Sequence, residues 1–573
     1  METFCDASAR QGGFFGRHRP ATLYYHGSLY TGDPTRRNAA AMLVEDGKIL
    51  WIGDDAKQAL KRGEIAESWE REVDLEGRFV CPGFIDSHMH MAEYGKLLTE
   101  VPLSDHTDSI RQVCDRVRDF IRENQIPEGT WVCGRGWNQD YFQDERRFLT
   151  CHDLDQISTR HPIYLARACG HVVTVNSRAL EAAGVTRETA QPADGHFQTD
   201  DKGEPLGIFE ENGVLLVKKA IPAVTVARLK EYLEAAARSL NSFGITSVHT
   251  DDFLSIPGAD YEMVLQAYRE LEREGRLPIK VYEQAQLADP KRLKEFLEKG
   301  YCTGTGTDYV RIGPLKIIGD GSLGARTAFL SEPYEDRKGT CGIPVFTQEQ
   351  LDEMISHANR HGMQVAVHAI GDRIMEQVIS AYEKALRECP RRDHRHGIVH
   401  CQITTRALLK KIEELSLHTY IQSIFLDYDS KIVESRVGEK RAKETYQFAA
   451  LFHMGQGMSN GSDSPVETPD VMKGIQCAVT RASLDKTRTF LPDQALTVEE
   501  ALASYTVMGA RASFEEEKKG MFRAGMAADF TVLDRDPFRV PPEELGTITA
   551  VQTYVDGVLV YDRGSATCPD RIR

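Results

Sequence analysis

The feature that most constrains the fold of this chain is a regular alternation of short apolar runs with amphipathic helical stretches between residues 83 and 510. One of these stretches, 347–362, carries Leu351, Met354, Ile355 and Ala358 at the spacing of a single helix face. Such alternation predicts an α/β fold in which parallel strands are joined by crossover helices, and eight such units make a (β/α)8 TIM barrel. The eight strand candidates are 83–90, 245–250, 279–286, 313–320, 363–371, 396–401, 418–423 and 454–463.

The two ends of the chain share a different pattern. Residues 22–82 and 511–573 contain short apolar runs separated by turns such as Asp46-Gly47 and Asp556-Gly557, which favour β-hairpins. We expect one composite β-sandwich built from both ends, and the alternative is a pair of unrelated β appendages. The barrel domain then spans 83–510. Its first two strands are separated by 97–225, which is too long for a loop and predicts an inserted subdomain or lid, and 1–21 is expected to be a tail.

Composition excludes several classes of protein. The chain has 70 Lys and Arg against 86 Asp and Glu, a formal charge of −16, which disfavours nucleic acid as a general partner. No apolar window reaches the length of a membrane span, and the N-terminus lacks the apolar core of a signal peptide. The 12 cysteines are scattered without a C-x-x-C pair, so a reduced, cytoplasmic protein is expected.

Histidines gather at the carboxyl ends of the predicted strands, which face the active site in a barrel of this kind. His88 and His90 lie at i and i+2 on one strand and therefore point to the same face, at a spacing that can chelate one metal ion. An isolated H-x-H is usually a surface accident, and a strand-terminal histidine is often a hydrogen-bonded core residue. Several such histidines with an aspartate fit that explanation poorly, because burying unpaired polar groups is costly and a divalent ion removes the cost. The remaining members are His249, His368, His400 and Asp463.

Lys316 lies inside the fourth predicted strand, where a buried ammonium is expensive. One interpretation is that Lys316 pairs with Asp320 or with another acid. The other is that it reacts with carbon dioxide and becomes a carbamate, an anionic ligand able to bridge two metal ions. The residues alone leave both open.

Taken together, these motifs resemble the amidohydrolase superfamily. More specifically the chain is similar to the amidohydrolase family 3 (YtcJ-like) branch, which includes N-substituted formamide deformylases. The resemblance covers about 22–563 and rests on the segments 80–90, 131–140, 170–185, 204–213, 244–252, 315–330, 367–378, 398–402, 459–471 and 525–534.

The resemblance implies a metal centre and a chemistry. Its ligands would be His88, His90, a carboxylated Lys316, His368, His400 and Asp463, and they would hold one or two divalent ions, with zinc expected. The implied reaction is hydrolysis of a non-peptide, amide-type C–N bond in a small molecule by metal-activated hydroxide. Asp463 would shuttle the proton from water to the leaving nitrogen, or serve as a ligand only. Lys316 and His400 are the other expected catalytic residues.

Five further residues are candidates for binding the substrate, each with a structural alternative. His249 would line the pocket or fill the core. His171 and Asn176 would each either reach the substrate or stabilise the insertion. Arg326 would hold a substrate carbonyl or pair with an acid. Trp137 would wall the pocket or pack, and Glu210 is assigned to loop structure.

Two other functions are weighed against this hydrolase. A ring deaminase of the same superfamily usually carries a glutamate shortly after the strand-five histidine, whereas here residues 369–372 are Ala, Ile, Gly and Asp. A non-catalytic scaffold relative would have lost ligands that this chain keeps.

The Gly-rich segment after Lys316 lacks G-K-[ST], so it is not a nucleotide P-loop. A homodimer is expected from the resemblance alone.

Overall fold

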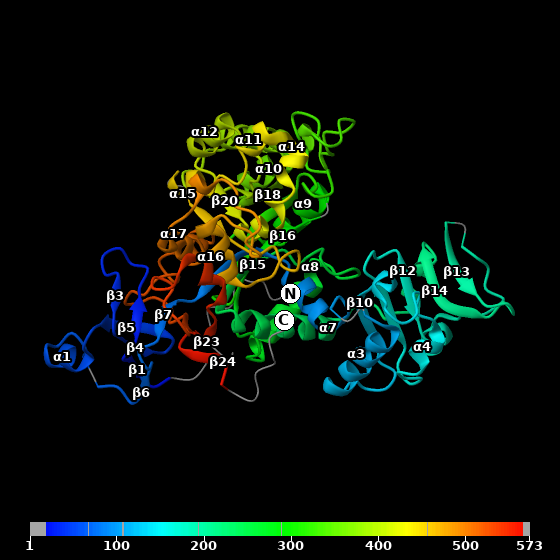
Figure 1. Ribbon diagram of the computed structural model, residues 1–573. Coiled ribbons are helices and arrows are strands. Elements are labelled where there is room, and N and C mark those ends of the chain that lie inside the picture. Colours follow the sequence, from blue (N-terminus) through cyan, green and yellow to red (C-terminus); the bar gives the residue numbers. More distant parts are fainter. Residues whose placement is uncertain are drawn as a thin grey trace. The chain divides into compact units, whose positions relative to one another are not determined.

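The computed structural model describes residues 19–564, apart from 67, 106–107, 193, 288 and 455–456. Most of the predicted tail, 1–18, and the last nine residues therefore lie outside the described residues. The chain divides into two compact units, drawn in Figure 1. Unit 1 contains 1–93 and 226–573, and unit 2 is Tyr94–Thr225.

An eight-stranded parallel sheet forms the centre of unit 1. Its order runs β8, β15, β16, β17, β18, β19, β20, β21, so strands follow one another around the sheet as they do along the chain. The strands are β8 (Phe84–Met89), β15 (Ile245–Thr250), β16 (Lys280–Gln286), β17 (Val310–Ile318), β18 (Val365–Ala369), β19 (Gly397–His400), β20 (His418–Ile421) and β21 (Met458–Asn460). The (β/α)8 architecture predicted from the alternation is confirmed.

Backbone hydrogen bonds bring the last strand back to the first. Just beyond β21, the amide of Asp463 donates to the carbonyl of His88 at 2.8 Å, and the amide of His90 donates to the carbonyl of Ser464 at 2.8 Å. The barrel is therefore nearly closed, and the segments that carry His88, His90 and Asp463 lie side by side.

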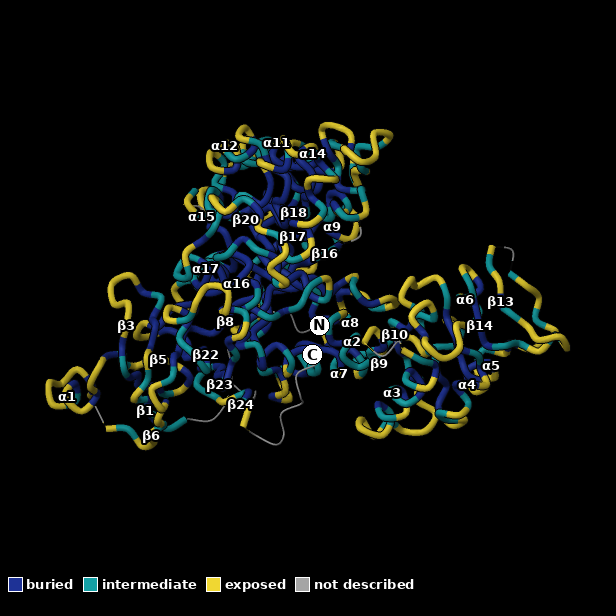
Figure 2. The backbone as a smooth tube through the Cα atoms, viewed as in Figure 1, coloured by how far each residue is buried: buried dark blue, intermediate teal, exposed yellow. Residues whose placement is uncertain are grey.

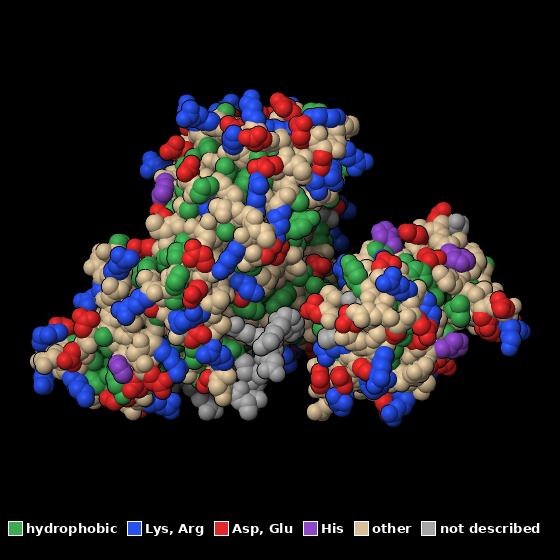
Figure 3. Space-filling view, in the orientation of Figure 1, with side chains coloured by type: hydrophobic (Ala, Val, Ile, Leu, Met, Phe, Trp, Pro, Cys, Tyr) green, Lys and Arg blue, Asp and Glu red, His purple; other side chains and the backbone are tan. Residues whose placement is uncertain are grey.

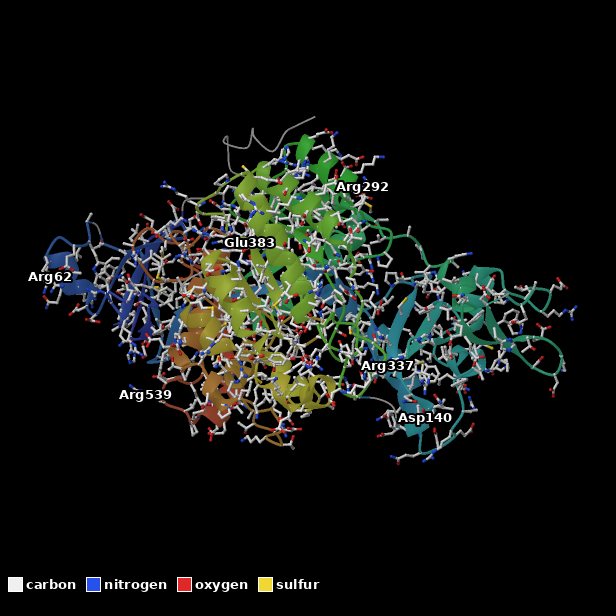
Figure 4. All side chains as sticks on the ribbon, turned by 90° about the horizontal axis from the view of Figure 1, so that it is seen from above. Arg62, Asp140, Arg292, Arg337, Glu383 and Arg539 are labelled. Atoms are coloured by element: carbon white, nitrogen blue, oxygen red, sulfur yellow. The ribbon has the colours of Figure 1, made fainter. Side chains whose placement is uncertain are left out.

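The helices between the strands cover the barrel with their apolar faces. In α10 the predicted stripe of Leu351, Met354, Ile355 and Ala358 is buried, and a capping box of Thr347 and Gln350 begins the helix. Figure 4 labels Arg292 on α9 and Glu383 on α11, which belong to this helical shell. The helices of this unit are α7 (Val226–Ser242), α8 (Tyr261–Arg273), α9 (Pro290–Glu298), α10 (Gln348–Arg360), α11 (Asp372–Glu388), α12 (Arg406–Glu414), α13 (Leu426–Asp429), α14 (Val433–Ala442), α15 (Phe448–His453), α16 (Val471–Thr480), α17 (Val498–Ser504) and α18 (Val507–Ala512), and the boundary between the units falls within α2 (Met91–Leu98).

Both ends of the chain build the β-sandwich of unit 1. One sheet has the order β5-β4-β1-β6, and the other, β24-β23-β22-β7-β2-β3, mixes strands from the two ends. Their shared core includes Tyr24, Phe530 and Tyr554, so the composite sandwich is confirmed. Its elements are β1 (Thr22–Tyr25), β2 (Ser28–Tyr30), β3 (Asn38–Ala39), β4 (Ala41–Glu45), β5 (Lys48–Gly53), α1 (Ala56–Lys61), β6 (Arg71–Asp74), β7 (Phe79–Pro82), β22 (Phe530–Leu533), β23 (Ala550–Val555) and β24 (Val558–Asp562).

Unit 2 has a sheet of its own with the order β13-β14-β12-β11-β10-β9. Two hydrophobic clusters stabilise it, one around Trp137 and Phe142 and the other around Phe197 and Phe209. The elements are β9 (Val101–Pro102), α3 (Ile110–Glu123), β10 (Val132–Trp137), α4 (Cys151–Asp155), β11 (Ile163–Arg167), β12 (Val172–Val175), α5 (Ser177–Ala183), β13 (Gly195–Thr199), β14 (Pro205–Glu211) and α6 (Val214–Lys218).

The barrel strands are the most deeply buried part of unit 1. The barrel strands are dark blue in Figure 2, whereas exposed positions gather on loops and on the outer faces of helices. On the face shown in Figure 3, acidic and basic side chains are interspersed over each unit. Within the described residues, no helix combines the length and the apolar character that a membrane crossing requires.

Candidate metal centre

The predicted ligands lie at the carboxyl ends of the barrel strands. His88 is the last residue but one of β8, and His90 directly follows that strand. Lys316 is in β17, His368 is in β18 and His400 ends β19. Asp463 follows β21. His400 and Asp463 have φ values of 76° and 57°, in the left-handed region that most residues avoid. Backbone in this region persists only where its surroundings impose it, and such positions cluster at functional sites.

Two imidazoles converge on one carboxylate oxygen. Asp463 Oδ1 lies 3.2 Å from His88 Nε2 and 3.1 Å from His90 Nε2. The His400 ring centroid is 5.5 Å from that of His88 and 4.4 Å from that of His368. One ligand atom each from His88, His400 and Asp463 lie within 4.8 Å of one another, close enough to hold one ion.

The second ring nitrogen of each histidine faces an oxygen acceptor. His88 Nδ1 donates to Gln284 Oε1 at 2.9 Å, and His400 Nδ1 donates to Gln422 Oε1 at 2.7 Å. His368 Nδ1 lies 3.0 Å from Asp320 Oδ1. His90 Nδ1 lies against Asp251 Oδ1.

With Nδ1 engaged in these contacts, Nε2 is the ring nitrogen that each histidine would present to a metal. Metal-binding histidines usually place the other ring nitrogen on a carboxylate or carbonyl, which sets the tautomer and the ring orientation. The donor set of imidazoles and carboxylates therefore fits a divalent ion of the zinc type.

Burial favours the neutral, metal-binding form of two of these histidines. It lowers the pKa of His88, with Lys316 adding to the effect, and it lowers the pKa of His400 well below its usual range, with His368 adding to the effect. For Asp463 burial acts in the opposite direction, but the contacts with His88 and His90 hold the pKa of this carboxyl well below its usual range. His90 differs: although burial acts to lower its pKa, the carboxylates of Asp251 and Asp463 raise it well above the usual range. His88 and His400 are therefore neutral beside an ionised Asp463, whereas His90 stays protonated until a bound metal replaces its proton.

Lys316 is fully buried and pairs with Asp251. Its Nζ lies 2.9 Å from Asp251 Oδ2 and 3.1 Å from His88 Nε2. The sequence analysis left Asp320 or another acid as the partner of Lys316, and in the structure the partner is Asp251. Asp320 instead contacts His368 and accepts backbone hydrogen bonds from Ile370 and Gly371.

Asp251 is the site residue that sequence reasoning missed. It is 0% exposed and directly follows β15. The available signal was its position two residues after His249, which puts both side chains on the same strand face and places a carboxylate at a strand end.

Asp86 and Gly461 position the two chain segments that carry the ligands. Asp86 Oδ2 accepts from the Ser462 hydroxyl at 2.6 Å, and Oδ1 accepts from the amides of His88 and Ser462 at 3.2 and 3.1 Å. A Cβ at Gly461 would lie 2.6 Å from the backbone nitrogen of His88. Only glycine therefore allows β21 to approach the H-x-H segment this closely.

Two residues of unit 1 that were predicted to bind the substrate, His249 and Arg326, contact other residues of the protein. His249 is buried, its ring centroid lies 5.0 Å from that of Tyr282, and neither of its ring nitrogens has a hydrogen-bond partner in the described part of the chain. Burial lowers the pKa of His249 to about 3, with a contribution from Lys519. Arg326 Nε and Nη2 contact the two oxygens of Asp336 at 3.0 and 2.7 Å, which is the acid-paired alternative.

The candidates in unit 2 have the contacts of structural residues. Trp137 lies in the core of unit 2 and donates to the carbonyl of Leu165 at 3.1 Å. Asn176 is buried and caps α5. His171 is exposed and pairs with Glu211 at 3.0 Å. Glu210 accepts from Gln198 at 3.3 Å. For Trp137 and Asn176 this favours the structural alternatives, and contact of any of these residues with a substrate stays a prediction.

Comparison with known proteins agrees with this geometry. The model of the amidohydrolase family matches residues 71–561. The chain belongs to the amidohydrolase family. It is 34% identical over 546 residues to the amidohydrolase YtcJ of Bacillus subtilis, a match covering 94% of this chain and 99% of that protein. It is 25% identical to the N-substituted formamide deformylase of Arthrobacter pascens, covering 94% and 98%.

A solved structure supports the same assignment. The crystal structure of an uncharacterized metal-dependent hydrolase from Pyrococcus furiosus matches with a TM-score of 0.73 and 31% identity, over 91% of this chain and 100% of that chain. The predicted family is therefore confirmed, and the protein is a metal-dependent hydrolase that acts on carbon–nitrogen bonds.

Proposed function

We propose that this protein hydrolyses a non-peptide, amide-type C–N bond in a small molecule, at a centre of one or two zinc ions held by the strand-end histidines and Asp463. The observation that carries the proposal is the convergence of His88 Nε2 and His90 Nε2 on Asp463 Oδ1, with His400 beside them. Formamides, N-acyl amines and cyclic amides are the substrate classes to test first, and the relative named as an N-substituted formamide deformylase supports the formamides.

A divalent ion in such a site lowers the pKa of a bound water toward 7 and polarises a carbonyl oxygen. The residues of this chain would supply the rest. Asp463, whose low pKa keeps it ionised, would accept the proton of the attacking water and pass it to the leaving nitrogen. The acceptors on the Nδ1 atoms would hold the imidazoles in one tautomer while the proton moves.

Carboxylation of Lys316 is part of the proposal. Its Nζ is fully buried and lies 3.1 Å from His88 Nε2, so a carbamate on it would add an anionic oxygen next to one of the proposed ligands. Intact-mass measurement of the native protein, with and without bicarbonate, tests it. A mass increase equal to one carbon dioxide, lost in Lys316→Ala, supports the carbamate, and a native mass without it contradicts the carbamate.

The decisive experiment is elemental analysis of the purified protein by plasma mass spectrometry, together with turnover of an amide panel. We expect one to two equivalents of zinc in the wild type, less in His88→Ala, and release of an amine plus an acid. A wild type that neither contains zinc nor takes it up would refute the proposal. Ammonia released from a ring would favour the deaminase instead.

We further propose a cytoplasmic location and a homodimer. Gel filtration with light scattering tests the dimer.

A further inference from the structure

A pair of histidines in the helical shell has the spacing of a metal chelate. His357 lies in the last turn of α10 and His361 caps the carboxyl end of that helix, and their ring centroids are 4.5 Å apart. Two histidines at i and i+4 share one face of a helix, a pattern that binds zinc in proteins. Neither histidine belongs to the candidate metal centre at the carboxyl ends of the barrel strands.

The two rings differ in their hydrogen bonds. His361 Nδ1 donates to the backbone carbonyl of His357 at 2.8 Å, one of the carbonyls that lose their helical partner where α10 ends. His361 therefore presents the lone pair of Nε2, and its tautomer is set as it is in metal-binding histidines. The ring of His357 makes no hydrogen bond in the described part of the chain, so it can turn toward an ion without losing one.

The state of His357 and the position of the pair both suit a bound cation. His357 is half-buried and His361 is exposed, so an ion can reach them from solvent. Burial lowers the pKa of His357, and the neighbouring His361 adds to the effect, which keeps the imidazole neutral near pH 7. The carboxyl end of a helix also carries a partial negative charge, which attracts cations to its last turn.

The charged side chains around the pair leave an excess of negative charge. Lys294 Nζ lies 3.8 Å from Glu298 Oε1, and Arg360 Nη1 lies 3.6 Å from Glu388 Oε2, so each nearby cation has an acid beside it. Glu353, one turn earlier on α10, lines a hollow between α9 and α10 together with Lys294. Among the described residues no cation pairs with Glu353. A metal ion is therefore attracted to this face rather than repelled.

We propose that His357 and His361 bind one divalent transition ion, such as zinc or copper, at the carboxyl end of α10. The two imidazoles are the protein ligands, and water completes the coordination. This ion is separate from those proposed for catalysis, and the inference does not rest on the proposed function.

The test is copper titration of the full chain after its catalytic centre has been filled with zinc and unbound zinc has been removed. Electron paramagnetic resonance follows the copper, because its nitrogen splitting reports the number of imidazole ligands. We expect one equivalent of copper bound by two imidazoles. His357→Ala and His361→Ala should each bind it at least about 10-fold more weakly, since losing even an outer-shell partner of a metal costs about 10- to 100-fold.

His453 offers a matched control. It is an exposed histidine at the carboxyl end of another helix, α15, and residues 449 and 457 are alanine and glycine, so it has no second histidine at i±4. His453→Ala should bind copper as the wild type does. Melting curves without copper check folding, and the exposed position of His361 lets His361→Ala decide the test if His357→Ala does not fold.

Three outcomes overturn the inference. They are wild-type copper affinity in His361→Ala, a wild-type spectrum with a single imidazole, and a loss of binding in His453→Ala equal to that in His361→Ala. The last outcome assigns the copper to exposed histidines in general. A wild type whose catalytic centre takes up no zinc defeats the proposed function instead, and the comparison of the wild type with His361→Ala still decides this inference.

Discussion

Gly461 gives the sharpest test of how the barrel closure positions the metal centre. A Cβ at this position would lie 2.6 Å from the backbone nitrogen of His88 and 2.8 Å from Asp86 Oδ1. The nearer atom belongs to the backbone, and Asp86 Oδ1 is held by the amides of His88 and Ser462, so the backbone has to shift. Overpacking of this kind costs about 1–3 kcal/mol. We therefore expect Gly461→Ala to lower the free energy of unfolding of the metal-free protein by that amount, and to weaken zinc binding because Asp463 moves relative to His88.

The assay is urea unfolding of the metal-stripped protein followed by circular dichroism, together with a zinc titration. Gly339→Ala is the matched control, because no heavy atom lies within 4 Å of a Cβ there and its φ is not left-handed. The control should stay within about 0.5 kcal/mol of the wild type. Equal unfolding midpoints and zinc affinities for Gly461→Ala and the wild type would refute the reasoning that this glycine sets the distance between the two segments.

Three further changes test other parts of the molecule. Asp463→Asn should reduce turnover by about 100-fold or more if the carboxylate transfers the proton, and turnover within a few-fold of the wild type at saturating zinc would contradict that role. Burial acts to raise the pKa of Glu515, but the 2.8 Å ion pair with Lys519 outweighs it and lowers this pKa from 4.5 to about 2. The pair therefore contributes stability above pH 4.5, and this contribution is lost as the pH falls toward 2. Glu515→Gln should cost about 3–5 kcal/mol at pH 7 and flatten the loss of stability below pH 4.5, as measured by urea unfolding. Trp137→Ala should destabilise unit 2 by about 3–5 kcal/mol, whereas Trp137→Phe with near-normal stability and a raised KM would indicate a pocket role instead.

The sequence was sufficient for the barrel and for most of the candidate site. Strand periodicity and helix spacing are local signals, and each histidine at the end of an apolar run can be placed on the catalytic face of a barrel without knowing any contact. His88 and His90 were the clearest case, because i and i+2 on a strand share a face whatever the tertiary structure. The hairpins at Asp46-Gly47 and Asp556-Gly557 also have their glycines at positive φ.

What the sequence could not supply were the partners of these groups. Lys316 and Asp320 are neighbours in the chain, but Lys316 pairs with Asp251, 65 residues away, because β16 lies between their strands and both side chains point into the barrel. Asp251 itself stands in a Thr-Asp-Asp run that is typical of a turn or a helix cap. Trp137 lies in a glycine-containing motif, and only the packing of unit 2 shows that its indole fills a core.

The same neighbour relations explain how the barrel orients its ligands. His400 on β19 is held by Gln422 beyond β20, His368 on β18 by Asp320 beyond β17, and His90 beyond β8 by Asp251 beyond β15. In each pair the two residues come from adjacent strands, so the spacing of the parallel sheet sets the direction of the imidazole. His88 differs, since Gln284 reaches it from β16, one strand further away.

The chemistry of these acceptors is not uniform. His88 and His400 face amides, whereas His90 and His368 face carboxylates, which make an imidazole a stronger donor to a metal. Asp251 is alone among the four acceptors in also contacting Lys316, the one basic side chain among the predicted ligands. A substitution of Asp251 therefore removes a contact of His90 and a contact of Lys316 at once.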